Sequence, residues 1–248
     1  MAATLRSLRS MLALLVAVTA TLPWLSACQP TASSNSFFPL EAGHHWTYRV
    51  TTTLEDDSSP EVEALTLRAL GAEKLSELGD QAVWRRHSDS GVDYWLRVDE
   101  TGIYRLASQS VLDEHVQSDT ARRYVLKTPL QPGTQWQVPT TAYLLMRNNE
   151  FPREIRHAHP KIPMNYQIME SNLTVDSPAG RFKNCLRVQG LATLRLYADA
   201  ASGWRDLPLT TQEWYCAGVG LVRMERREPA RSAFLTGGTR TLELESWE

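Results

Sequence analysis

Apolar and polar side chains alternate at every second position along many short windows of this sequence. In the first window, Trp46, Tyr48 and Val50 fall on one face of an extended chain, with polar residues between them. A period of two residues is typical of a β-strand that is buried on one face. Similar windows occur at residues 46–52, 61–70, 81–87, 94–98, 102–106, 124–126, 140–146, 165–175, 185–189, 193–197, 210–215, 220–226 and 240–247.

Few windows have a helical period, and the best of them, residues 110–117, is short. Many short strands bounded by Gly, Pro, Asp and Ser are typical of antiparallel β architectures. The sequence therefore predicts a mainly β fold with few short helices. We expect an antiparallel, strongly curved sheet of the half-barrel or barrel-like kind, and a sandwich is the alternative.

A secretory leader precedes these windows. Arg6 and Arg9 are the only charged residues before Glu41, and an apolar run at residues 11–22 follows them. A positive start, a short apolar run and small residues before a cleavage site are typical of a signal peptide. The run is too short to span a bilayer comfortably as a helix of the mature chain.

The leader ends in Leu25-Ser26-Ala27-Cys28, which resembles the lipobox of bacterial lipoproteins. The resemblance implies that cleavage leaves Cys28 as the first residue, and that acyl chains on its thiol and amine anchor the protein to a membrane. Gln29 follows, in place of the Asp that resembles an inner-membrane retention signal. We therefore expect an outer-membrane lipoprotein that faces the periplasm; a plain secretory signal with an accidental Cys is the alternative.

Three segments follow from this division: a signal peptide at 1–27, a flexible tether at 28–36, and a single β-rich domain at 37–248. The tether is small and polar throughout, which is typical of a flexible linker. The chain is 42% hydrophobic and 22% charged, as in ordinary globular proteins. Its formal net charge of −2 gives no basic footprint for nucleic acid.

Residues 40–46 and 130–136 share the pattern Leu-x-x-Gly-x-x-Trp. The pattern predicts a tight turn at each Gly, followed by a strand that opens with a buried Trp. An internal duplication is an alternative interpretation of this repeated pattern.

Three phrases, taken together, resemble a family of uncharacterised bacterial periplasmic lipoproteins labelled TapB-like. They are Phe38-Pro39-Leu40-x-x-Gly43-x-x-Trp46-x-Tyr48, then Ser177-Pro178-Ala179-Gly180-Arg181-Phe182-Lys183-Asn184-Cys185-Leu186, then Trp214-Tyr215-Cys216-Ala217-Gly218-Val219-Gly220-Leu221-Val222. The resemblance spans nearly the whole mature chain. It implies a β-rich fold, akin to the curved half-barrel of the LolA and LolB lipoprotein carriers, and no established reaction. Cys216 departs from the pattern, where Ala or Pro is expected.

The two cysteines that remain after Cys28 are Cys185 and Cys216. Two thiols in an oxidising compartment favour a disulfide between them. Two separate, buried thiols that act as small apolar residues are the alternative. A redox-active pair is not expected, because the sequence has no Cys-x-x-Cys motif.

No catalytic, metal or cofactor site is expected. The sequence contains no Gly-x-Ser-x-Gly, Ser-x-x-Lys, P-loop or dinucleotide-binding motif. His157 and His159 have the spacing of two ligands on a strand, with Glu154 as a third group. They lie in a segment with three prolines at 148–163, which favours a solvated loop.

The same insert holds the one cluster of basic residues, and it is a candidate partner surface. Its members are Arg147, Arg153, Arg156, His157, His159 and Lys161. Such a cluster suits an acidic partner or a lipid head group, and a solvated loop is the alternative.

The sequence thus predicts a non-enzymatic, lipid-anchored protein of the bacterial outer membrane that binds an envelope protein, a peptide or an amphiphile. Seven Trp residues of the mature chain are available to line a concave face of the sheet, although core packing also accounts for them. A lipid or lipoprotein carrier with an apolar groove is one alternative, and an uncharacterised hydrolase is another.

Overall fold

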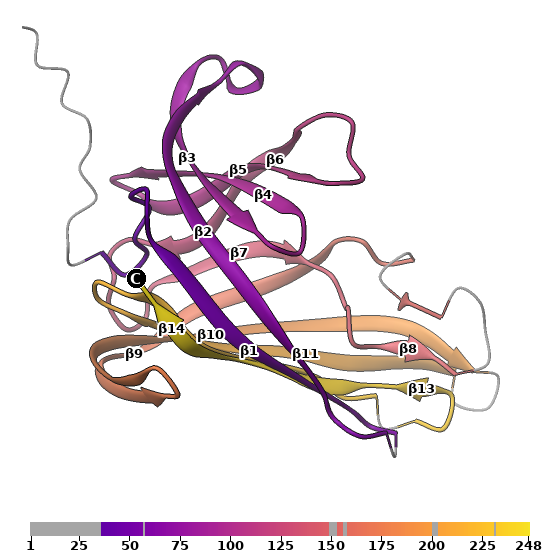
Figure 1. Cartoon of the computed structure of the whole chain (residues 1–248). Coiled ribbons are helices and arrows are strands. Elements are labelled where there is room, and N and C mark those ends of the chain that lie inside the picture. Colours follow the sequence, from indigo (N-terminus) through magenta and orange to yellow (C-terminus); the bar gives the residue numbers. More distant parts are fainter. Residues whose placement is uncertain (1–35, 57, 149–152, 156–157, 200–202, 231) are drawn as a thin grey trace, which may run out of the picture. The chain divides into compact units, whose positions relative to one another are not determined.

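Extended chain accounts for nearly all of the regular structure (Figure 1). The computed structural model describes residues 36–248 apart from residues 57, 149–152, 156–157, 200–202 and 231, and the described residues belong to one compact unit. The strands are β1 (His45–Leu54), β2 (Glu61–Leu75), β3 (Gln81–Ser88), β4 (Val92–Asp99), β5 (Gly102–Ser110), β6 (Gln117–Lys127), β7 (Gln135–Thr140), β8 (Met146–Arg147), β9 (Ile162–Ser177), β10 (Gly180–Asp199), β11 (Gly203–Cys216), β12 (Gly220–Glu228), β13 (Leu235–Thr236) and β14 (Gly238–Trp247).

Twelve of these strands form one antiparallel sheet in the order β6-β5-β4-β3-β2-β1-β14-β12-β11-β10-β9-β7. The sheet curves until its two edge strands, β6 and β7, approach each other, so that it is nearly closed into a barrel. Arg123 on β6 donates from Nη2 to the carbonyl oxygen of Pro139 on β7 at 2.7 Å, across the remaining opening. We call this opening the seam. The predicted mainly β, antiparallel, strongly curved fold is confirmed.

The strand order divides the sheet into two meanders of six strands. The first half runs through β1 to β6, and the second through β7, β9, β10, β11, β12 and β14; β1 and β14 join the halves. Each half opens with the Leu-x-x-Gly-x-x-Trp pattern. Gly43 and Gly133 have φ angles of 99° and 95°, and both Trp46 and Trp136 are buried at the start of a strand. The predicted tight turn and buried Trp are confirmed at both openings, and the internal duplication stays a hypothesis.

The expected helix at residues 110–117 is wrong: Ser110 ends β5, Gln117 begins β6, and residues 111–116 connect the two strands. The Asp113 carboxylate accepts hydrogen bonds from the backbone nitrogen and the hydroxyl of Ser110, at 2.7 and 2.8 Å. Such local bonds compete with a helix. Val111 and Leu112 are 80% and 91% exposed, so no apolar face is buried that would stabilise a helix. A short 3-10 helix, η1 (Ser76–Leu78), lies between β2 and β3.

The window at 140–146 is also not one strand, because only its two ends belong to strands, β7 and β8. The buried Glu228 carboxylate accepts from the backbone nitrogens of Leu144 and Leu145 at 2.8 and 3.2 Å, which removes both from any ladder. Conversely, the windows at 185–189 and 193–197 are parts of one long strand, β10.

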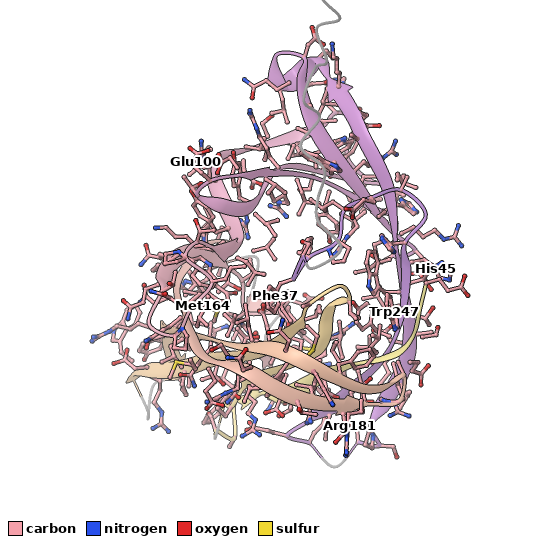
Figure 2. All side chains as sticks on the ribbon, turned by 90° about the vertical axis from the view of Figure 1, so that its left-hand side faces the viewer. Phe37, His45, Glu100, Met164, Arg181 and Trp247 are labelled. Atoms are coloured by element: carbon pink, nitrogen blue, oxygen red, sulfur yellow. A yellow bond between two sulfur atoms is a disulfide. The ribbon has the colours of Figure 1, made fainter. Side chains whose placement is uncertain are left out.

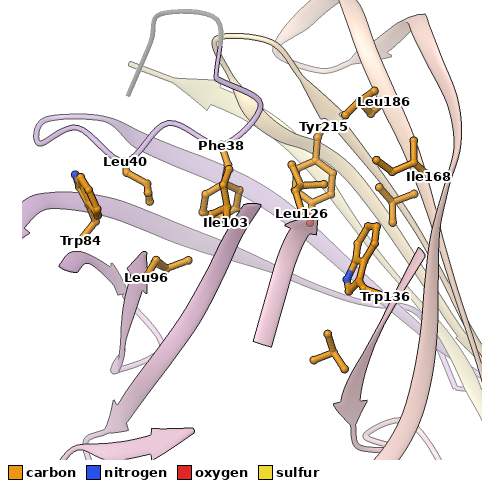
Figure 3. Close-up of a cluster of buried hydrophobic side chains, with 12 residues drawn as sticks. Phe38, Leu40, Trp84, Leu96, Ile103, Leu126, Trp136, Ile168, Leu186 and Tyr215 are labelled. Atoms are coloured by element: carbon orange, nitrogen blue, oxygen red, sulfur yellow. The ribbon is translucent and has the colours of Figure 1, made fainter. Parts of the chain in front are cut away.

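The core that fills the curved sheet draws on both halves. Figure 3 shows one cluster of buried side chains that face one another from opposite walls. The first half and the segment before it supply Phe38, Leu40, Trp84, Leu96, Ile103 and Leu126; the second half supplies Trp136, Val138, Ile168, Leu186, Val188 and Tyr215. No helix among the described residues is long and apolar enough to cross a membrane.

The segment before β1 enters the core rather than lying outside it. Phe38 and Leu40 are buried, and Phe37 packs against the same cluster (Figure 2). The backbone nitrogen of Gly218, in the turn between β11 and β12, donates to Ser36 O at 2.9 Å. The chain therefore reaches the sheet at the β11–β12 turn and inserts its first aromatic side chains between the walls.

Candidate functional site

A cavity of about 320 Å³ lies inside the curved sheet. Its lining comes from ten strands of both halves and from the inserted N-terminal segment, and it combines aliphatic and aromatic side chains with four charged ones. The lining residues are Phe38, Tyr48, Leu67, Arg86, Tyr94, Leu96, Arg105, Arg123, Tyr124, Val125, Val138, Tyr166, Glu213, Tyr215 and Leu221. An apolar cavity with a few polar groups is the usual form of a small-molecule site.

Arg86 is the most deeply buried of the charged lining residues. Residues Trp84, Arg86 and Ser88 of β3 share the inward face of the sheet, which carries the Arg86 side chain into the core. Its guanidinium carbon lies 3.9 Å from the centre of the Phe38 ring and 4.4 Å from that of Trp46. Nη2 donates to the carbonyl oxygen of Pro39 at 2.8 Å. Burial lowers the pKa of Arg86 to about 10, so the side chain keeps its charge at neutral pH.

Glu213 on β11 is the carboxylate in the cavity wall. It accepts a hydrogen bond from the Tyr215 hydroxyl at 2.6 Å and a longer one from Thr211 Oγ1 at 3.4 Å. Burial raises the pKa of Glu213 above its ordinary value, although these two bonds and the charge of Arg226 act in the opposite direction.

Two arginines line the cavity beside the seam and share one carboxylate. Arg105 on β5 donates to both oxygens of Asp119, from Nε at 2.7 Å and from Nη2 at 2.8 Å. Arg123 Nε lies 3.8 Å from the same carboxylate. Burial lowers the pKa of Arg123, and the charge of Arg105 acts in the same direction. Two cations for one anion leave this part of the wall positive.

An aromatic pair forms the wall of β7 and β9. The rings of Trp136 and Tyr166 stack with centres 5.7 Å apart and an interplanar angle of 8°. Tyr166 lies against Gly190 of β10, where a Cβ atom would meet Tyr166 Cε1 at 2.9 Å and Thr211 Cγ2 at 2.6 Å. Glycine at position 190 therefore makes room for the Tyr166 ring of the stacked pair.

Two of the tyrosine hydroxyls at the cavity are engaged in hydrogen bonds within the protein. The phenol of Tyr48 donates to Leu221 O at 2.9 Å and that of Tyr215 to Glu213, so both hydroxyls already have partners. Among the described residues no group of three metal-ligating side chains gathers anywhere. What the cavity offers a ligand is apolar and aromatic surface with cations at its edge.

The residues predicted from sequence lie elsewhere. Cys28, the proposed lipidation site, is outside the described residues, as are Arg156 and His157 of the basic cluster. Cys185 and Cys216 pair across β10 and β11 and are joined by a disulfide with an S–S distance of 1.99 Å.

The described part of the basic cluster is spread over a loop. Arg147 Nη2 donates to Tyr197 O at 3.1 Å, and Arg153 Nε donates to Arg147 O at 3.2 Å, so the Arg153 side chain contacts the backbone of Arg147. His159 is half-buried and Lys161 is exposed. None of these residues lines the cavity.

Sequence reasoning did not single out the charged residues of the cavity. A signal was present for one of them, because Arg86 occupies an inward position of a strand between Trp84 and Ser88. Arg105, Arg123 and Glu213 have polar partners that are close in sequence. The cavity that they line is formed by strands of both halves, so no local pattern identifies them as cavity residues.

No protein-family model matches this sequence, and the search of curated proteins finds no relative. Two solved structures are similar. One is a candidate lipoprotein of Parabacteroides distasonis, with 14% identity and a TM-score of 0.42 over 86% of this chain and 98% of that one. The other is a candidate exported protein of Bacteroides fragilis with a YmcC-like fold, with 13% identity and a TM-score of 0.35 over the same shares.

Proposed function

We propose that this protein is a non-enzymatic, lipid-anchored binding protein of the bacterial outer membrane, and that it holds an amphiphile inside its curved sheet. The observation that carries the proposal is the cavity of about 320 Å³ between the two halves. Its volume lies in the range of small-molecule sites, at the lower end. That size favours one short apolar body over several acyl chains.

The chemistry of the lining supports an amphiphile over a wholly polar ligand. Aliphatic and aromatic side chains such as Leu67, Val125 and Tyr94 supply a surface from which an apolar body gains by leaving water. The charged groups are few, and three of the four are arginines. A ligand with an apolar body and one polar end matches this distribution.

The anchor supports a ligand that comes from a membrane. The predicted lipidation site, Cys28, precedes Phe38 by ten residues. A chain of that length spans at most about 35 Å. Phe38 itself lines the cavity. Lipidation at Cys28 would therefore keep the binding domain within reach of the bilayer surface, where amphiphiles are concentrated.

Native mass spectrometry of the full-length protein, extracted from membranes in the bulky detergent digitonin, tests this function. We expect the protein to carry a non-covalent amphiphile that organic extraction releases. Val125→Trp places a large ring in the cavity and should abolish the adduct. Val62→Trp is the matched control, because Val62 lies on the exposed face of β2, and it should retain the adduct.

Two results would contradict the proposal. One is a wild-type protein that carries no adduct and takes up none when amphiphiles are added. The other is an adduct that survives Val125→Trp unchanged, since a ligand held in the cavity has no room beside the new ring.

Binding of an envelope protein is the second candidate function, and one exposed aromatic pair favours it. Tyr197 on β10 and Trp204 on β11 are 46% and 62% exposed, with ring centres 6.0 Å apart. Arg147 reaches the same strand end through Tyr197 O. Photo-crosslinkers at position 204 should trap one defined envelope protein, whereas crosslinkers at position 62 should trap none.

A further inference from the structure

Arg86 is a cation held in the core without an anionic partner among the described residues. Its side chain is 6% exposed, and the acceptor it uses is the neutral carbonyl oxygen of Pro39. Its Nε atom is buried and has no hydrogen-bond partner. The Phe38 and Trp46 rings stabilise the guanidinium through their faces, but they accept none of its in-plane N–H bonds.

The neighbouring groups do not neutralise Arg86. The ionisable groups that interact with it are the phenols of Tyr48 and Tyr215, and burial raises the pKa of both, so both are uncharged at neutral pH. Glu213 interacts instead with Arg226 and with its two hydroxyl donors. A charge buried without a counter-ion is unfavourable, and a bound anion would remove this cost.

Arg86 also lines the cavity, so a ligand in the cavity lies beside the guanidinium. The other cations of the wall, Arg105 and Arg123, share Asp119 and leave a positive surplus at the seam. Among the described residues, Glu213 supplies the one carboxylate of the cavity lining. The field inside the sheet therefore favours a negative group over a neutral or positive one.

We infer that the amphiphile carries one acidic head group, a carboxylate or a phosphate, which binds Arg86 in the cavity. This inference rests on the proposed function and names the chemical class of its ligand. A guanidinium presents its N–H groups in a planar fork that matches either acid. The apolar body of the ligand then lies along the aromatic and aliphatic walls.

Four probes with the same twelve-carbon tail test the inference: dodecanoate, dodecyl phosphate, 1-dodecanol and dodecyltrimethylammonium. Their binding to the full-length protein in digitonin is measured by native mass spectrometry at pH 7.5. A charge-assisted hydrogen bond in a dry site is worth about tenfold or more in affinity. We therefore expect at least one acidic probe to bind about tenfold or more tightly than the alcohol and the ammonium probe. The stronger of the two acids distinguishes a fatty-acid type of ligand from a phospholipid type.

Two variants assign the preference to Arg86. Arg86→Gln should bring the acidic probes to within about twofold of dodecanol, and Arg86→Lys, which keeps the charge, should retain part of the preference. The matched control is Arg85→Gln. Arg85 is the next residue of the same strand, but it pairs with Asp93 outside the cavity lining, so its loss should leave the preference unchanged.

The outcomes separate this inference from the proposed function. If none of the four probes binds, the proposed function itself is wrong. If all four bind the wild-type protein with equal affinity, the cavity binds amphiphiles, but the inference of an acidic head group is wrong. This comparison uses the wild-type protein alone and does not depend on the folding of a variant. If the acidic preference persists in a folded Arg86→Gln protein, Arg86 is not the head-group site.

Discussion

The buried arginines of this domain are stabilised in two different ways. Arg226 donates from Nε to Glu228 Oε1 at 2.9 Å, and both side chains are almost fully buried. Glu228 in turn accepts from backbone nitrogens of the segment after β7, so this ion pair fixes that segment. Arg86 has aromatic rings and one carbonyl oxygen in place of a carboxylate. The first arrangement is complete, whereas the second leaves an in-plane donor unused.

The complete pair predicts a large loss of stability on truncation. Glu228→Ala leaves the buried Arg226 cation without its carboxylate partner, although its bond to Thr141 O remains. It also leaves the backbone nitrogens of Leu144 and Leu145 without their acceptor. We expect the free energy of unfolding to fall by about 3–5 kcal/mol. Urea unfolding measures it, with Glu61→Ala as an exposed control on β2. A fall of less than about 1 kcal/mol would mean that water reaches the pair.

Asp99 predicts how stability depends on acid pH. Burial alone would raise the pKa of this carboxyl, but hydrogen bonds from Thr101 and Tyr104 and the charge of Arg122 outweigh it and lower the pKa to about 2. A carboxyl with a lowered pKa in the folded state contributes stability above its ordinary pKa near 3.8, and this contribution is lost as the pH falls toward 2. Asp99→Asn should therefore destabilise the protein by about 1–2 kcal/mol at pH 7, a moderate value because the group lies near solvent.

Urea unfolding at several pH values checks the Asp99 prediction. The gap between wild type and Asp99→Asn should close as the pH falls from 5 to 2. A gap that is constant over this range would show that the lost contribution is packing and not charge.

At the level of elements, the disulfide joins β10 to β11, the strand whose following turn contacts the N-terminal segment. Cys185 and Cys216 pair directly across β10 and β11, and Gly218, in the turn that follows β11, contacts Ser36. The bridge thus secures the pair of strands beside which the N-terminal segment enters the core. β10 and β11 also carry the exposed aromatic pair at their far end.

Removal of the bridge should lower stability without changing the fold. The two cysteines are 31 residues apart, and closure of a loop of this length contributes about 3–4 kcal/mol on the loop-entropy account. Cys185→Ala with Cys216→Ala should unfold at correspondingly lower urea, with an unchanged far-ultraviolet spectrum. Reduction of the wild type should reproduce the shift, and the double variant should not respond to reductant. Two free thiols in non-reducing mass spectrometry of the mature protein would contradict the pairing.

At the scale of the whole molecule, the two six-stranded halves have a common core. The buried cluster of Figure 3 takes six residues from β1–β6 and the segment before them, and six from the second half. Each half also has a buried cluster of its own, but the cluster of Figure 3 is completed only when the two halves meet.

The shared core predicts one cooperative unfolding transition. Tryptophan fluorescence reports on both halves, through Trp84 and Trp136, and circular dichroism reports on the whole sheet. We expect the two urea transitions to coincide. A fragment of residues 37–127 should not fold alone but should regain structure when mixed with residues 128–248. Two separate transitions, or a folded fragment, would mean that each half has its own core.

The sequence predicts the strands well because their alternation is local. It fails at residues 140–146 and 110–117, where Glu228 and Asp113 capture backbone nitrogens, and only the first of these contacts is distant in sequence. The cavity is harder to predict because its contacts join segments that are distant in sequence. Arg86 contacts Phe38, Trp46 and Pro39, which belong to segments that lie beside β3 only in the folded sheet.

The seam between β6 and β7 is the place where the sheet can separate at the lowest cost in backbone hydrogen bonds. Every other neighbouring pair of strands in the sheet is joined by a ladder, so separating them breaks many backbone bonds. Between β6 and β7, among the described residues, the hydrogen bond from Arg123 to Pro139 O bridges the two strands. The sheet can therefore open between β6 and β7 and close again while its other strands stay paired. Under the proposed function, the amphiphile would pass between the cavity and a bilayer when β6 and β7 separate locally. The exchange rate should then depend on the free energy of separating these two strands more than on the free energy of unfolding the whole domain.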